Sequence, residues 1–214
     1  MYETILFDLD GTITESAPGI IASIRYAMET LKLPPLDDAT LNLFIGPPLT
    51  YSFKHYAHLD DETAQLATAT YRERYNHIGL FESTLYEGIE VVLQQLKAAG
   101  KKLYIATAKP EPLARRILEH YQLEQYFEDI VGATFDGVVS TKEQVINLVL
   151  SRNTDICAET TVMVGDRHHD IEGAHHHHLD AVGVLYGYGD FDELKQAGAT
   201  HIVETTQALL DLLL

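Results

Sequence analysis

From residue 85 onward, short apolar runs alternate with stretches of helical periodicity, and this alternation limits the possible folds more than any other feature of the sequence. We expect strands near residues 103–106, 130–133, 161–164, 181–186 and 201–203, with helices that begin near Pro110, at Lys142 and after Asp170. Repeated strand–helix–strand units form right-handed crossovers and place helices on both faces of a parallel sheet. The apolar run at residues 5–7 supplies a further buried strand, so the sequence predicts an α/β fold with a parallel sheet.

The segment between residues 15 and 80 has a different pattern. Apolar side chains at Ile20, Ile24 and Met28 recur at helical spacing after a candidate N-cap at Ser16. Further helices are expected near residues 49–56 and 60–77, with no strand signal between them. We therefore expect a discontinuous α/β core, residues 1–14 and 81–214, with an inserted α-helical domain at residues 15–80.

The composition limits where such a protein can act. The chain has 214 residues, no apolar run long enough to cross a bilayer and no basic N-terminal signal region, so we expect a soluble, cytoplasmic protein. Its formal net charge of −17 opposes binding to nucleic acid or to an anionic membrane. Cys157 is the only cysteine, which excludes an internal disulfide. A phosphorylated ligand would need a local cluster of cations.

Two carboxylates follow the first predicted strand. Asp8 and Asp10 are separated by one residue and are followed by Gly11 and Thr12. Like charges this close disfavour joint ionisation unless a cation lies between them. The pair therefore indicates either a solvated turn or a metal site.

Two other predicted strands also end in oxygen-bearing side chains, and ligands of open parallel sheets bind at the carboxyl ends of strands. Thr107 is either an N-cap or, with the N–H groups of Ala108 and Lys109, part of an anion site. Asp166 follows its strand as Asp8 follows the first one. These carboxylates can therefore converge on a hard cation such as Mg²⁺.

Lys142 and Asp170 each allow two interpretations. Ser140 and Glu143 have the spacing of a capping box, which places Lys142 in the first turn of a helix, where the dipole disfavours a cation. Its side chain therefore reaches either solvent or a phosphate. Asp170 is either an acid that favours the start of a helix or a member of the same site as Asp166.

In this order, the motifs at residues 8–12, Thr107, Lys142, and Gly165-Asp166 with Asp170 resemble those of the haloacid dehalogenase superfamily. The resemblance covers essentially the whole chain and implies a Rossmann-like core with a small α-helical cap at residues 15–80. Residues 45–49 and 183–189 are similar to the phosphoglycolate phosphatase and 5′-nucleotidase-like branch.

The resemblance also implies roles for individual residues. Asp8 would be the nucleophile that forms an aspartyl phosphate, and Asp10 would be the general acid and base. Mg²⁺ would be held by Asp8, the main-chain carbonyl of Asp10 and Asp166, while Asp170 would order the water shell of the metal or Lys142. The phosphoryl oxygens would be bound by Thr107, Ala108, Lys109 and Lys142.

The implied function is a Mg²⁺-dependent phosphatase for small-molecule phosphate monoesters, acting as a monomer or homodimer. A β-phosphoglucomutase-like phosphosugar mutase would use the same aspartyl phosphate, and a non-catalytic phosphometabolite-binding protein is a further alternative. A dehalogenase has no leaving alkoxide to protonate and would not need Asp10. Gly46 and Pro47, in the helical insertion, either form a plain turn or contact the leaving group.

Six of the 11 histidines lie between residues 168 and 178. His175 and His178 are expected one helical turn apart, where they form either a solvated helix face or a transition-metal site. The hard-cation site needs no imidazole, so we assign these histidines no catalytic role.

Overall fold

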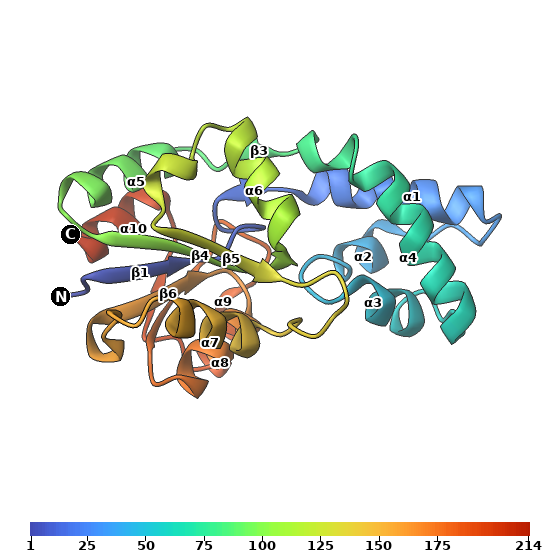
Figure 1. Ribbon diagram of the computed structural model, residues 1–214. Helices are drawn as coiled ribbons and strands as arrows, with labels where there is room; N and C mark the ends of the chain where they lie inside the picture. Colours follow the sequence, from blue (N-terminus) through green and yellow to red (C-terminus); the bar gives the residue numbers. More distant parts are fainter. The chain divides into compact units, whose positions relative to one another are not determined.

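The computed structural model describes residues 1–214, which divide into two compact units (Figure 1). The first unit comprises Met1–Glu15 and Leu85–Leu214, and the second comprises Ser16–Thr84. The chain leaves the first unit after β2 (Thr14–Glu15) and returns to it within β3 (Thr84–Leu85).

A six-stranded sheet with the order β5-β4-β1-β6-β7-β8 forms the centre of the first unit. Every neighbouring pair of strands is parallel, which confirms the predicted α/β fold. The strands are β1 (Thr4–Phe7), β4 (Lys102–Pro110), β5 (Asp129–Ala133), β6 (Thr161–Gly165), β7 (Asp180–Val184) and β8 (His201–Val203).

Helices cover both faces of this sheet, as the alternating pattern predicted. In Figure 1, α5 and α6 lie above the sheet, and α7 and α8 lie below it. The helices of this unit are α5 (Ile89–Ala98), α6 (Glu111–His120), α7 (Lys142–Arg152), α8 (His168–His176), α9 (Phe191–Gln196) and α10 (Thr206–Leu213), with 3₁₀ turns at η2 (Glu124–Tyr126) and η3 (Ala158–Thr160).

One hydrophobic core lies between the sheet and the helices α7 and α8. Leu6, Tyr104 and Met163, from the adjacent strands β1, β4 and β6, pack in one cluster with Val145 of α7 and Ile171 of α8. Full burial of an aliphatic side chain contributes about 1.5–3 kcal/mol. This packing fixes the central strands, and with them the residues that follow their carboxyl ends.

The second unit is entirely helical apart from its link to β3. Buried residues of α1 include Ile24 and Met28, and those of α4 include Ala67 and Tyr71. The elements are α1 (Ala17–Thr30), α2 (Asp38–Asn42), α3 (Leu49–His55), α4 (Asp61–Tyr75) and the 3₁₀ turn η1 (Gly79–Phe81).

The start of α7 differs from the prediction. Its N-cap is Thr141, whose hydroxyl accepts a hydrogen bond from the N–H of Gln144, and the Gln144 side chain accepts from the N–H of Thr141. The expected box of Ser140 and Glu143 is therefore wrong by one residue, because Thr141 and Gln144 have the same spacing and cap equally well. Lys142 still lies in the first turn.

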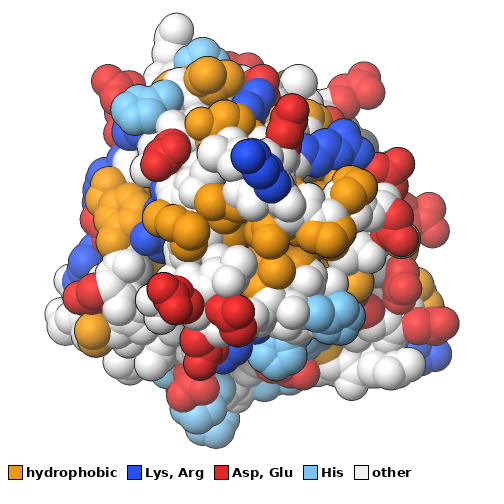
Figure 2. All heavy atoms as spheres, turned by 90° about the vertical axis from the view of Figure 1, so that its right-hand side faces the viewer, with side chains coloured by type: hydrophobic (Ala, Val, Ile, Leu, Met, Phe, Trp, Pro, Cys, Tyr) orange, Lys and Arg blue, Asp and Glu red, His pale blue; other side chains and the backbone are white.

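None of the helices combines the length and the apolar character that crossing a membrane requires. Acidic side chains are scattered over the face drawn in Figure 2, as the net charge of −17 leads one to expect.

Candidate active site

The sheet topology places Asp8 between two other strand ends. β1 lies between β4 and β6, and Phe7 is in register with Ile105 of β4 and Val164 of β6. The N–H of Asp8 donates to the carbonyl oxygen of Val164 at 2.9 Å. Asp166 directly follows β6 and lies at the same edge of the sheet as Asp8, as predicted. Thr107 lies near that edge too, but within β4, which continues to Pro110 and does not end at Thr107 as expected; its register with β5 shifts between these two residues.

Three carboxylates meet at this edge of the sheet, and we call Asp8, Asp166 and Asp170 the carboxylate cluster. One oxygen atom from each lies within 4.8 Å of the other two. All three residues are buried, with exposed fractions of 8%, 0% and 1%. Buried carboxylates at this spacing require compensating positive charge.

Lys142 supplies part of that charge. Its Nζ atom lies 2.6 Å from Oδ1 of Asp8 and 2.7 Å from Oδ1 of Asp170, and it donates to the carbonyl oxygen of Ala106 at 2.8 Å. Of the two interpretations from the sequence, solvent exposure is therefore wrong, because the side chain crosses from α7 into the buried site. The ammonium group contacts two of the three carboxylates.

Burial and the neighbouring charges shift the pKa values of the carboxylate cluster and of Lys142. Burial raises the pKa of Asp8 to about 6, against the opposing effect of Lys142. Burial, together with Asp170 and Asp8, raises the pKa of Asp166 well above its ordinary value. Burial alone would lower the pKa of Lys142, but the carboxylates of Asp170 and Asp8 outweigh it and raise that pKa.

These properties fit a divalent cation. The possible metal ligands are buried carboxylate oxygens from three residues, and these atoms lie close enough to one another to bind one ion. The single positive charge of Lys142 does not neutralise three carboxylates. Hard cations bind such oxygen sets. The carboxylate cluster can therefore hold a metal ion.

Asp10 and Thr107 lie in a neighbouring group of contacts organised by Lys109. The Nζ atom of Lys109 is 2.7 Å from Oδ2 of Asp10, and both side chains are largely buried. The N–H of Lys109 donates to the hydroxyl of Thr107 at 3.2 Å, while Ala108 between them is partly exposed. Lys109 was predicted to bind phosphate, and here its ammonium group is paired with Asp10. The arrangement leaves Oδ1 of Asp10 buried without a hydrogen-bond partner.

Asp170 performs both tasks that the sequence left open. Its Oδ2 atom accepts from the N–H of Arg167 at 3.1 Å in the first turn of α8, and its Oδ1 atom pairs with Lys142. A Cβ atom at Gly165 would lie 2.2 Å from Cγ of Asp170. The helix cap thus holds the carboxylate in the site.

The loop after β7 holds Asp166 in place, a role that was not predicted from the sequence. The N–H of Tyr188 donates to Oδ2 of Asp166 at 2.8 Å. A Cβ atom at Gly187 would lie 2.4 Å from Cβ of Asp166, and one at Gly189 would lie 2.0 Å from its carbonyl oxygen. The sequence signal for this contact is the pair of glycines at positions 187 and 189, because glycine allows the backbone to approach another residue closely.

Two predicted substrate contacts belong to the second unit. Gly46 and Pro47 lie between α2 and α3, and Gly46 has a φ of +108°, which favours glycine. The turn interpretation accounts for this geometry. Contact with a leaving group stays a prediction.

The predicted pairing of His175 and His178 on one helix is wrong. α8 ends at His176, and His178 has a left-handed φ of 58°. After the helix ends, the chain continues into the buried residue Leu179. Gly198 lies against the His175 ring in the last turn of the helix.

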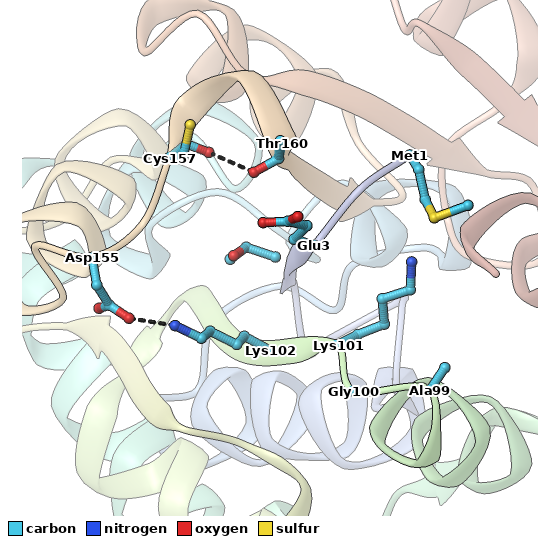
Figure 3. Close-up of a pocket in the computed structure, with 10 residues that line it drawn as sticks. Met1, Glu3, Ala99, Gly100, Lys101, Lys102, Asp155, Cys157 and Thr160 are labelled. Carbon is cyan, nitrogen blue, oxygen red and sulfur yellow. Dashed lines mark hydrogen bonds and ion pairs between the residues drawn. The ribbon is translucent and has the colours of Figure 1, made fainter.

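A pocket of about 340 Å³ lies at the opposite edge of the sheet, where β1, β4 and β6 begin (Figure 3). Lys102 points toward Asp155 and forms an ion pair with it, and the hydroxyl of Thr160 donates to the carbonyl oxygen of Cys157. None of the predicted site residues lines this pocket.

Comparison with known proteins gives consistent matches over the whole chain. A family profile described as haloacid dehalogenase-like hydrolase matches residues 5–184. A "5'-nucleotidase" of Pseudomonas aeruginosa is 39% identical over 212 residues, which cover 99% of this chain and 96% of that protein. A "Tyrosine-protein kinase PtkA" of Mycobacterium tuberculosis is 38% identical over 98% of this chain and 70% of that protein. The crystal structure of a predicted phosphatase from Clostridium acetobutylicum has a TM-score of 0.93 and 42% identity, covering 99% of this chain and 98% of that one.

Proposed function

Because the chain belongs to the haloacid dehalogenase-like hydrolases, we propose that it is a Mg²⁺-dependent phosphatase that hydrolyses phosphate monoesters of small metabolites through an aspartyl phosphate at Asp8. The observation that carries the proposal is the buried carboxylate cluster with Lys142 beside Asp8. Positive charge in such a site allows a carboxylate nucleophile and a phosphate dianion to approach each other, although the two anions otherwise repel.

Asp8 would begin the reaction. Its carboxylate oxygen attacks phosphorus, a new oxygen–phosphorus bond forms, and the bond to the leaving oxygen breaks. Asp10 gives its proton to the leaving oxygen and then takes one from the water that attacks the aspartyl phosphate. Release of inorganic phosphate returns both residues to their starting states.

The remaining residues of the site would bind and orient. Asp8, Asp166 and the main-chain carbonyl of Asp10 hold Mg²⁺, and Asp170 keeps Lys142 in position. When bound, Mg²⁺ supplies positive charge that offsets the repulsion between phosphate and carboxylate. The hydroxyl of Thr107 and the N–H groups of Ala108 and Lys109 hold phosphoryl oxygens, together with Lys142.

Lys109 has a second task in this scheme. In the structure its ammonium group pairs with Asp10, and both groups are largely buried. An arriving phosphate competes for that ammonium group, so substrate binding frees Asp10 to hold the proton that it delivers.

The second unit, Ser16–Thr84, would choose the leaving group. The core residues act on the phosphoryl group and the metal, which every monoester presents alike, so discrimination requires other residues. Gly46 and Pro47 are our candidates for that contact. The similarity to a 5′-nucleotidase makes nucleoside monophosphates the first class to test. Phosphoglycolate is the second, because residues 45–49 and 183–189 are similar to the phosphoglycolate phosphatase branch.

A second candidate function is transfer of the phosphoryl group to an acceptor other than water. The similarity to a protein named a tyrosine kinase is the observation that favours this second function. A phosphosugar mutase would use the same aspartyl phosphate and return the phosphoryl group to the sugar, and a kinase would pass a phosphoryl group to a hydroxyl acceptor. Neither would release inorganic phosphate in proportion to the substrate consumed.

The test is a panel of phosphorylated metabolites assayed with Mg²⁺ for inorganic phosphate. We expect release from nucleoside monophosphates or phosphoglycolate, and none from Asp8→Asn, whose amide cannot attack phosphorus. Circular dichroism checks that the variant is folded. Absence of phosphate release across the panel, or full activity of folded Asp8→Asn, would contradict the proposal.

A further inference from the structure

Two imidazoles and one carboxylate come together at the start of α8, outside the carboxylate cluster. One ligand atom from each of His168, His169 and Glu172 lies within 4.8 Å of the other two. The centroids of the two imidazole rings are 3.8 Å apart. Glu172 follows His168 by four residues, so the two side chains lie on the same side of the helix.

Glu193 of α9 orients His168. The Oε1 atom of Glu193 lies 2.7 Å from Nδ1 of His168, and it also accepts from the N–H of His168 and from Nε of Arg167, each at 2.9 Å. A carboxylate oxygen only accepts, so Nδ1 carries the proton and Nε2 keeps a free lone pair. Carboxylates fix metal-binding histidines in this way.

The other two side chains are free to close around an ion. His169 and Glu172 are exposed, and neither side chain has a hydrogen bond or an ion pair within the chain. Rotation of these side chains can bring their ligand atoms to the distance of about 2.0–2.2 Å at which nitrogen and carboxylate oxygen bind zinc. An ion can reach them directly from solvent.

We propose that His168, His169 and Glu172 form a second metal site, which takes a transition-metal ion of the Zn²⁺ class. Its imidazole nitrogens favour such ions, whereas the carboxylate cluster offers the oxygen atoms that Mg²⁺ prefers. Three protein ligands leave one coordination position open. The site is independent of the phosphatase reaction, since none of its ligands takes part in the proposed steps.

The test is calorimetric titration of the full chain with Zn²⁺ in saturating Mg²⁺, which keeps the carboxylate cluster filled. We expect one Zn²⁺ per chain. His169→Gln and Glu172→Gln should each weaken Zn²⁺ binding by roughly tenfold or more, and Glu193→Gln by roughly 10-fold to 100-fold through loss of ring orientation. Visible absorption of bound Co²⁺ should report nitrogen ligation and should change in His169→Gln.

Matched variants locate the ion. His178→Gln removes a histidine from the same sequence cluster but not from the proposed site, so it should bind Zn²⁺ as the wild type does. Asp8→Asn should also bind Zn²⁺ normally, and loss of binding there would assign the ion to the carboxylate cluster. Equal Zn²⁺ affinity in the wild type, His169→Gln and Glu172→Gln, or no saturable binding at all, would overturn the proposal. Phosphatase activity with Mg²⁺ should persist in His169→Gln and Glu172→Gln whatever their Zn²⁺ affinity.

Discussion

The ammonium group of Lys142 lies 2.6 Å from a carboxylate oxygen of Asp8, although 134 positions separate the two residues in the sequence. The contact joins the first turn of α7 to the carboxyl end of β1, and both partners are buried. One interaction therefore holds the proposed nucleophile and compensates part of its charge. Its loss should affect stability and turnover together.

Replacing Lys142 by methionine tests that dual role. Lys142→Met leaves Asp8 and Asp170 buried without their cation, so the free energy of unfolding at neutral pH should fall by roughly 3–5 kcal/mol. Turnover should be lost as well. Urea unfolding and steady-state rates measure the two effects. Lys102→Met is the matched control, because its ion pair with Asp155 is exposed, and it should change neither quantity appreciably.

The raised pKa of Asp8 predicts how stability depends on pH. Burial raises this pKa to about 6, whereas an aspartate in an unfolded chain has a pKa of about 4. The folded state therefore binds a proton that the unfolded state has released. In a chelator, stability should fall as pH rises from about 4 to about 6, by on the order of 3 kcal/mol, and stay lower above that range.

Mg²⁺ should reverse this loss, because it binds the ionised carboxylates of the folded state. Melting temperatures measured with and without Mg²⁺ at about pH 5 and about pH 7.5 give the comparison, and the larger stabilisation should occur at the higher pH. Equal stabilisation at both values would show that the carboxylate cluster does not bind the ion.

Asp10 should matter in proportion to the basicity of the leaving oxygen. Asp10→Ala should lower the rate by about 10²-fold or more for alkyl phosphates, whose leaving oxygen needs a proton. The loss should be smaller for nitrophenyl phosphate, whose leaving group is stable as an anion. Equal losses for both classes of ester would remove Asp10 from the role of general acid.

The glycine loop after β7 should control metal affinity. In Gly187→Ala the new Cβ atom would lie 2.3 Å from the carbonyl oxygen of Gly11 and 2.4 Å from Cβ of Asp166, so the loop and Asp166 cannot both keep their positions. Mg²⁺ affinity should fall by roughly 10-fold to 100-fold, as it does when groups that support metal ligands are lost.

Gly100→Ala is the control for this variant. It places a Cβ in open space at a positive φ of 78°. It should cost about 1–2 kcal/mol of stability and leave Mg²⁺ affinity unchanged. If Gly187→Ala binds Mg²⁺ as tightly as Gly100→Ala does, the loop has no role in holding Asp166.

The sequence allowed the central part of the site to be predicted because local patterns encode it. Asp8 and Asp166 each follow an apolar strand closely, and parallel strands bring their carboxyl ends to one edge. That rule brings Asp8 and Asp166 together, whereas Asp170 and Lys142 reach them from α8 and α7, and for each of these the sequence left two interpretations open. Their individual roles in catalysis stay predictions.

Other features depend on contacts that no local pattern contains. The cap of α7 was misplaced because two overlapping residue pairs, Ser140 with Glu143 and Thr141 with Gln144, have the same spacing. The close approach of Gly187 to Asp166 joins loops after two different strands. Helix α9, with six residues, is too short for helical periodicity to identify.

The most direct test of the proposed mechanism is to trap the phosphorylated residue. With nitrophenyl phosphate, whose leaving group needs no proton, Asp10→Asn should form the aspartyl phosphate and hydrolyse it slowly, because the base that activates water is missing. Reduction of the quenched enzyme with borohydride converts an acyl phosphate to an alcohol, and mass spectrometry of the peptides then locates the change. We predict homoserine at position 8 after reaction with a substrate that turns over. An unmodified Asp8 in enzyme that has released its leaving group, or a phosphoryl group on another residue, would contradict the assignment of Asp8 as the nucleophile.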